Sequence, residues 1–322
     1  MNELRRDYIL KERWVIIALN RGKRPNDFAG VQEEKEEQKT CFFCPGNEHL
    51  TPPEILRVKG EGGGWKIRCF PNKFPAVVEG KGRYNEGFLT YLIAHGKHEV
   101  VVETPTHPGN IAELSPEHLV QVFDIYQNRI DEHHKDPEVE YVSVFKNHRR
   151  AGGASLVHTH TQIISMSLLP PVVKAEVEGE LEYREENRVD CGFCDVIEKE
   201  KDKERCVFED GHSIALTPYA SRFPFEIWLF PKRHVKEWKE LNKGEKLSFV
   251  SILLKVLKRL KEGLNDPAYN FFIHYSPPGK DLHYHLELCP RLATWAGFEL
   301  STGVIINTMP PEIACKYYRG EV

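Results

Sequence analysis

The stretch His158-Thr159-His160-Thr161-Gln162, which follows a pair of glycines at positions 152 and 153, is the part of the sequence that decides the fold. Side chains two residues apart on a β-strand lie on the same face, so the two histidines and the glutamine would point the same way. Two imidazoles and a carboxamide on one face, beside glycines that let phosphates approach the backbone, predict a phosphoryl-transfer surface. Taken alone, the pattern also fits a zinc-binding pair of histidines or a solvated polar face.

Length and composition indicate a globular protein with a sizeable core. The 322 residues are 40% hydrophobic and 29% charged, with a net charge of −4, and they suffice for one large domain or two ordinary ones. The sequence has no basic stripe, so we expect no nucleic acid as the main partner. No stretch reaches membrane-spanning length, so we expect no membrane contact and a cytoplasmic location.

Four of the eight cysteines form two CxxC pairs, Cys41/Cys44 and Cys191/Cys194. In an intracellular chain with histidines nearby, such pairs indicate metal ligands before they indicate disulfides. The remaining four are scattered, and we expect them to be buried apolar residues: Cys69, Cys206, Cys289 and Cys315. Their spacing does not predict whether any two of them form a disulfide.

The two halves of the chain carry the same landmarks in the same order. Each half begins with a CxxC pair, continues with a β-rich segment that ends in a proline and a histidine, and has Glu-Leu six residues after that histidine. An amphipathic helix follows, expected at residues 116–134 and 243–264. Two strands joined by a glycine-containing loop come last, and the second strand carries HxH, His158/His160 and then His283/His285. These matches predict an internal repeat, which we place at residues 1–172 and 173–322.

The repeats differ where Gln162 of the first is matched by Glu287 of the second. A carboxylate at this position would repel a phosphate, whereas a carboxamide can donate a hydrogen bond to it. We therefore expect the first repeat to be catalytic and the second to be structural. The alternative is that the difference has no consequence.

Each repeat offers four ligands of the kinds that zinc takes in structural sites, thiolates and imidazoles. The first set is Cys41, Cys44, His107 and His158, and the second is Cys191, Cys194, His234 and His283. The alternative is one ribbon made of the four cysteines. His107 and His234 are assigned only by their position in the repeat. A metal on His158 would also fix the strand next to His160.

Together these features resemble the galactose-1-phosphate uridylyltransferase family of the histidine-triad superfamily, over nearly the whole chain. Similar motifs are the basic segment Arg21–Pro25, the CxxCPGNE segment Cys41–Glu48, the nucleoside-contacting segment Phe70–Pro75, Asn147 eleven residues before His158, Ser155, and Gly297-Phe298-Glu299. The resemblance implies an α+β fold of two fused histidine-triad-like repeats, each an antiparallel sheet with a covering helix. It also implies a homodimer with shared active sites.

The resemblance further implies a double-displacement reaction. His160 would attack the α-phosphorus of UDP-glucose, and galactose 1-phosphate would then take the uridylyl group to give UDP-galactose. Gln162 would donate a hydrogen bond to the α-phosphate. The implied substrate-binding residues for the nucleotide sugar and the hexose 1-phosphate are Arg21, Arg24, Asn72, Asn147, Ser155, Phe298 and Glu299.

The sequence departs from the family pattern at several positions. Thr159 and Thr161 stand where close relatives have proline and glycine, Lys73 replaces a common aspartate, and Phe298 replaces a tyrosine. Some relatives lack the second CxxC pair and bind iron instead, through positions that here would be Glu176, His274, His283 and His285. Because the second CxxC pair is present, we expect zinc on the thiolate set there, with iron as the alternative.

Other functions fit parts of the same pattern. A nucleotide-sugar phosphorylase, such as one acting on ADP-glucose, would use the same His160, and Lys73 and Phe298 lean toward it. A nucleotide hydrolase would not need two fused repeats. A zinc-stabilised nucleic-acid-binding module would explain the CxxC pairs but leaves His160 and Gln162 without a role.

Overall fold

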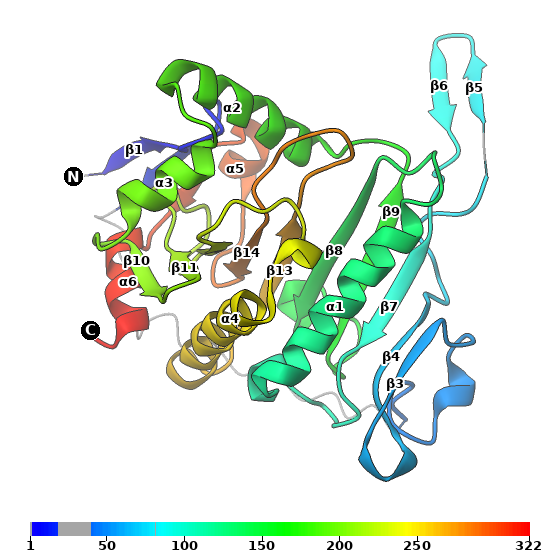
Figure 1. Cartoon of the computed structure of the whole chain (residues 1–322). Coiled ribbons are helices and arrows are strands. Elements are labelled where there is room, and N and C mark those ends of the chain that lie inside the picture. The colour runs from blue at the N-terminus through cyan, green and yellow to red at the C-terminus, as the bar shows by residue number, and fades with distance from the viewer. Residues whose placement is uncertain (1, 19–39, 81) are drawn as a thin grey trace.

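The structure is a computed structural model that describes residues 2–18, 40–80 and 82–322. Its centre is a ten-stranded antiparallel sheet with the order β10-β11-β12-β14-β13-β8-β9-β7-β4-β3 (Figure 1). The strands of the first half are β3 (Leu56–Lys59), β4 (Trp65–Pro71), β7 (His98–Val102), β8 (Tyr141–His148) and β9 (His160–Met166). Those of the second half are β10 (Cys206–Glu209), β11 (Ser213–Leu216), β12 (Ile227–Pro231), β13 (Tyr269–His274) and β14 (His285–Pro290). The α+β class expected from the sequence is confirmed.

The strand order is the same when it is followed outward from the centre in either direction. From β8 the order runs through β9, β7 and β4 to β3, and from β13 it runs through β14, β12 and β11 to β10. The two central strands pair antiparallel, with Asn147 opposite Asn270. Both HxH strands therefore occupy the same place in their halves, so the sheet topology repeats as the sequence predicted. The division at residue 172 stays a prediction.

One long helix in each half covers the same face of the sheet. These helices are α1 (Pro116–His133) and α4 (Lys243–Gly263), and each ends one residue before its predicted end. The Ser115 side chain accepts a hydrogen bond from the backbone at the start of α1, and Asn242 begins α4 with a capping box. The helices pack against each other, and the rings of Phe123 and Trp238 lie 5.0 Å apart in the core that surrounds them.

The remaining elements lie around this sheet. β1 (Glu3–Arg6) and β2 (Trp14–Ile17) form a small sheet with β15 (Ile305–Asn307) of the other chain end. β5 (Arg83–Glu86) and β6 (Leu89–Leu92) form a hairpin that projects from the body (Figure 1). The other helices are α2 (Pro171–Asn187), α3 (Gly192–Glu200), α5 (Gly297–Thr302) and α6 (Pro311–Arg319). Among the residues described, no helix has the length and apolar character needed to cross a membrane.

The strand β9 begins at His160, so His158 precedes it rather than lying within it. Both rings nevertheless lie on the same side of the chain, because both contact Phe43, with ring centroids 5.3 Å (His160) and 6.1 Å (His158) away. The Thr161 hydroxyl, by contrast, bonds to Tyr126 of α1. The sheet therefore presents the histidines on one face and carries its covering helices on the other.

Candidate active site

The first Cys/His set comes together beside the start of β9. The Nδ1 atom of His158 lies 3.5 Å from Cys41 Sγ, 3.8 Å from Cys44 Sγ and 3.4 Å from His107 Nδ1. His158 Nε2 donates to the backbone oxygen of Thr104 at 2.8 Å. Because that carbonyl can only accept, the proton of the imidazole is on Nε2 and the lone pair on Nδ1 faces the cysteines.

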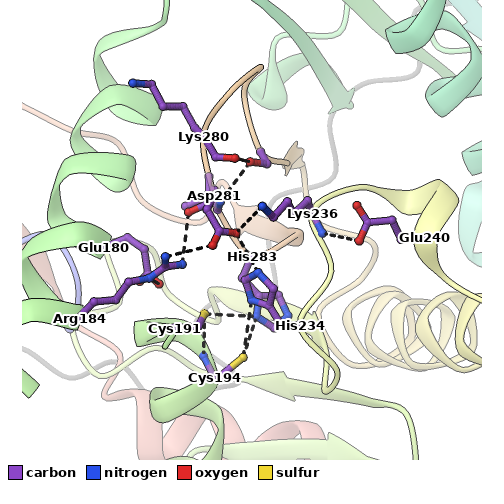
Figure 2. Close-up of polar contacts among 12 residues, drawn as sticks. Glu180, Arg184, Cys191, Cys194, His234, Lys236, Glu240, Lys280, Asp281 and His283 are labelled. Atoms are coloured by element: carbon purple, nitrogen blue, oxygen red, sulfur yellow. Dashed lines mark hydrogen bonds and ion pairs between the residues drawn. The ribbon is translucent and has the colours of Figure 1, made fainter. Parts of the chain in front are cut away.

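The second set has the same arrangement (Figure 2). His283 Nδ1 lies 3.4 Å from Cys194 Sγ and 3.8 Å from Cys191 Sγ, and His234 Nδ1 lies 3.8 Å from Cys194 Sγ. His283 donates through Nε2 to a backbone oxygen, while His234 Nε2 lies 2.9 Å from Oδ1 of Asp281. A carboxylate behind a histidine is the usual way in which proteins orient a metal-binding imidazole.

Both sets fit a tetrahedral metal ion. Zinc bonds of about 2.3 Å to sulfur and about 2.0 Å to nitrogen place neighbouring ligand atoms about 3.3 to 3.8 Å apart. The sulfur–nitrogen and nitrogen–nitrogen distances in the two sets run from 3.4 to 3.8 Å. The four ligand atoms of each set lie within 4.8 Å of one another.

The residues of the iron-type alternative do not converge as one set. The ring of His283 faces the cysteines, whereas Glu176, His274 and His285 lie together with Glu287 as a separate buried cluster. In that cluster His274 Nδ1 is 2.5 Å from Glu176, and Glu287 is ion-paired with Arg222. His283 Nδ1 faces the cysteines, and its Nε2 donates to a backbone oxygen. The geometry therefore favours His283 as a ligand of the thiolate set over the iron-type set.

His160 has the geometry of a nucleophile. Its Nδ1–H donates to the backbone oxygen of His158 at 2.8 Å, which leaves the lone pair of the ring on Nε2. Burial lowers its pKa to about 4, so the imidazole is neutral at pH 7. The bond also ties the ring to the backbone of His158, a member of the Cys/His set, so a metal there would hold the His160 ring in place as well.

Gln162 is oriented by His98, a residue that the sequence patterns did not single out. The backbone N–H of Ala76 donates to His98 Nδ1 at 3.2 Å, so the proton of this ring is on Nε2, which lies 2.9 Å from the Gln162 amide oxygen. Because the Gln162 amide oxygen accepts this bond, the NH₂ group is not needed by His98 and would be free to donate to a phosphate. Asn72 Nδ2 lies 3.1 Å from His98 Nε2, so the predicted substrate-binding residue Asn72 lies beside His98 and Gln162.

Asn147 is held by the second repeat. Its amide oxygen accepts a hydrogen bond of 2.8 Å from Asn270 Nδ2, and its own Nδ2 lies 3.5 Å from the Gly153 oxygen. Asn270 also donates to the Gly152 oxygen at 2.6 Å. The second half thus supports the glycine-containing loop of the first. Ser155 is exposed in this loop, between the 3₁₀ turn Arg150–Gly152 and β9.

The structure does not bring the other predicted residues that it describes, Phe298 and Glu299, to this site. Arg21 and Arg24 lie outside the described residues. Phe298 and Glu299 lie on α5, next to β15, and Figure 1 shows this helix well apart from β9.

The second HxH is covered more completely than the first. His285 is 1% exposed, against 6% for His160, and the rings of Phe193 and Phe230 pack on it at 4.9 and 5.2 Å. Glu287, at the position of Gln162, is neutralised by Arg222. The structural role expected for the second repeat stays a prediction.

Comparisons with known proteins agree with the fold. The sequence profile described as galactose-1-phosphate uridyl transferase, N-terminal domain, matches residues 2–170, and a profile for a domain of unknown function, DUF4921, matches residues 107–317. An ADP-glucose phosphorylase of Arabidopsis thaliana is 32% identical over 98% of this chain and 92% of its own. A galactose-1-phosphate uridylyltransferase of Thermotoga maritima is 29% identical over 99% of this chain and 98% of its own.

Two solved structures are similar over nearly their whole length. The Arabidopsis thaliana ADP-glucose phosphorylase with bound ADP-glucose aligns with a TM-score of 0.83 at 29% identity, covering 99% of each chain. A uridylyltransferase mutant aligns with a TM-score of 0.77 at 25% identity, covering 100% of this chain and 97% of the other.

The duplicated antiparallel fold and these relatives define the class of the protein, an enzyme of the nucleotidyltransferase and phosphorylase type. The chain belongs to the galactose-1-phosphate uridylyltransferase family.

Proposed function

We propose that the protein moves a nucleotidyl group from a nucleoside diphosphate sugar to a phosphate acceptor, through a covalent intermediate on His160. The observation that carries this proposal is the neutral imidazole of His160, whose Nδ1–H is committed to the His158 oxygen so that Nε2 is the nucleophilic atom. Neutral imidazole is a good nucleophile near pH 7, and the phosphoramidate that it forms can pass its group onward.

The reaction proceeds in two displacements. His160 Nε2 attacks the α-phosphorus, the bond from that phosphorus to the bridging oxygen breaks, and the sugar 1-phosphate leaves. An oxygen of the acceptor phosphate then attacks the same phosphorus and releases the imidazole. The Gln162 NH₂ group stabilises charge on the α-phosphate oxygens, with its orientation set by His98.

We propose ADP-glucose as the donor and inorganic phosphate as the acceptor, which makes the protein a nucleotide-sugar phosphorylase. This choice rests on the Arabidopsis thaliana phosphorylase, which is 32% identical, and on its ADP-glucose complex with a TM-score of 0.83. Lys73 and Phe298, which depart from the uridylyltransferase pattern, favour the same choice.

The second candidate is transfer between UDP-glucose and galactose 1-phosphate. It is favoured by the family profile over residues 2–170 and by the Thermotoga maritima uridylyltransferase, which covers 99% of this chain. The two activities share the His160 step and differ in the base of the donor and in the acceptor.

Intact-mass spectrometry after separate exposure to ADP-glucose and UDP-glucose, without acceptor, tests both. We expect an adenylyl adduct that maps to His160, is discharged by inorganic phosphate and is absent from a folded, metal-containing His160→Ala variant. A uridylyl adduct discharged by galactose 1-phosphate would instead establish the second candidate. No adduct from either donor would contradict the covalent mechanism.

The proposal includes zinc at the first Cys/His set and at the second, where iron is the alternative; metal analysis of the purified protein distinguishes them. It also includes a homodimer, because Phe298 and Glu299, for which the resemblance implies substrate contacts, lie on α5, apart from β9 of their own chain. Light scattering measures the oligomeric state directly.

A further inference from the structure

Behind the HxH segment, on the face covered by α1, lies a fully buried ion pair. Glu103 follows β7 and Lys146 lies in β8, and their side chains are 0% and 1% exposed. Lys146 Nζ is 2.6 and 2.9 Å from the two carboxylate oxygens of Glu103. The pair lies on the side of β9 opposite to the nucleophilic ring of His160.

This ion pair holds three consecutive residues of the HxH segment. Lys146 donates to the Thr159 hydroxyl at 2.8 Å and to the backbone oxygen of His160 at 2.9 Å. The hydroxyls of Thr159 and Thr161 donate to Glu103 at 2.6 and 2.5 Å. The three ammonium protons and both carboxylate oxygens therefore all have partners, and such a satisfied buried network is rigid. The two threonines, which depart from the family pattern, are the residues that complete it.

The second repeat has the same sheet topology without a lysine at the position of Lys146. Lys146 is opposite Thr161 in the sheet, and the matching partners in the second repeat are Ile273 and Leu286. Tyr284 stands at the position of Thr159, and all three residues of the second repeat are buried. Buried ion pairs contribute little net stability compared with apolar side chains of similar size. The half with His160 has the ion pair, and the half with the more deeply buried His285 has an apolar contact between Ile273 and Leu286 at the matching place.

We infer that Glu103 and Lys146 are positioning residues that hold the backbone around His160 so that Nε2 meets the α-phosphorus in line. This inference rests on the proposed function. Neither residue touches the substrate; each acts through the backbone of His160 or through the threonines beside it. Displacing a reacting group by about 1 Å can slow a reaction about 100-fold, so the position of this backbone matters for rate more than for stability.

The test is the double variant Glu103→Gln/Lys146→Met, which removes both charges and the bond to the His160 oxygen, while the glutamine can still bond the threonines. The matched control is Glu99→Gln/Arg129→Met. It neutralises another buried pair between β7 and α1, joined by bonds of 2.8 Å, that has no bond to the HxH segment. The readouts are Tm, metal content, KM for the nucleotide sugar, and the single-turnover rate of adduct formation on His160.

For the first double variant we expect the adduct rate to fall about 10- to 100-fold, with KM changed less than about threefold and metal content unchanged. The control should keep its adduct rate within about twofold of the wild-type rate. If the first double variant does not fold, Thr161→Val, which removes a single hydroxyl, should still lower the adduct rate severalfold.

The outcomes distinguish a failure of the positioning inference from a failure of the proposed function. An undiminished rate in the folded double variant, or in Thr161→Val where that variant replaces it, would overturn the positioning inference while leaving the proposed function intact. An equal loss of rate in the control would overturn it too, because the effect would then belong to any buried pair under α1. A wild-type protein that forms no adduct would overturn the proposed function and the inference with it.

Discussion

Replacing His98 with phenylalanine tests whether the orientation of Gln162 limits the rate. The substitution keeps the shape of the ring but removes the 2.9 Å hydrogen bond to the Gln162 amide oxygen. A hydrogen bond of this kind is worth about 1 kcal/mol net, which corresponds to about fivefold in rate if it acts only in the transition state. Loss of a phosphate-facing donor altogether costs about 100- to 1000-fold, so Gln162→Ala should be much slower than His98→Phe.

The assay is the single-turnover rate of adduct formation on His160, with KM for the nucleotide sugar measured separately because Asn72 also lies 3.1 Å from His98. His95→Phe is the matched control. His95 has the same exposure of 8%, and both of its ring nitrogens are bonded, to Gly80 and Asp136, without a bond to Gln162. We expect its adduct rate to be unchanged.

The double variant His98→Phe/Gln162→Ala decides the matter. If His98 acts only through Gln162, the His98 substitution costs nothing more once the amide is gone. A His98→Phe effect of the same size with and without the Gln162 side chain would refute the reasoning.

Three further predictions follow from the same geometry. Cys41→Ser should lose the metal of the first Cys/His set and lower Tm by several degrees, while the second set keeps its metal. Metal analysis measures the metal content and calorimetry measures Tm. A wild-type Tm that does not change when a chelator is added would contradict the assignment. Glu99 is buried, which raises its pKa, but hydrogen bonds from His133 and Arg129 outweigh burial and lower it from 4.5 to about 2. The stabilisation by ionised Glu99 is therefore present above pH 4.5 and is lost as the pH falls towards 2. In urea titrations, the difference in unfolding free energy between the wild type and Glu99→Gln should shrink by about 2 kcal/mol from pH 6 to pH 3. A difference that stays constant over this pH range would contradict the prediction. His285→Asn should lower stability yet leave the adduct rate on His160 within about twofold, because the His285 ring is 1% exposed; loss of the adduct in a folded variant would show that the second HxH takes part.

Features with a local or repeated pattern could be predicted from the sequence. The helices α1 and α4 were placed to within a residue at their ends, because apolar spacing and capping residues are local signals. The duplicated landmarks predicted the repeated sheet and the four members of each Cys/His set, since residues at equivalent positions of a repeat occupy equivalent places. The expectation that His158 lies within the strand was wrong, because the strand begins at His160.

The contacts that prepare His160 and Gln162 for reaction had no such signal. His98 is 64 residues from Gln162, and Glu103 is 43 residues from Lys146, so only the pairing of β7, β8 and β9 brings them together. A histidine, a glutamate and a lysine are also common surface residues, and nothing local marks these three as buried. The sequence by itself determined the repeat, its helices and its candidate ligands, because those depend on spacing along the chain. Tertiary structure alone decided which ring nitrogen of His158, His160 and His283 carries the lone pair, how deeply each HxH is buried and what holds the backbone of His160, because those depend on neighbours that are distant in sequence.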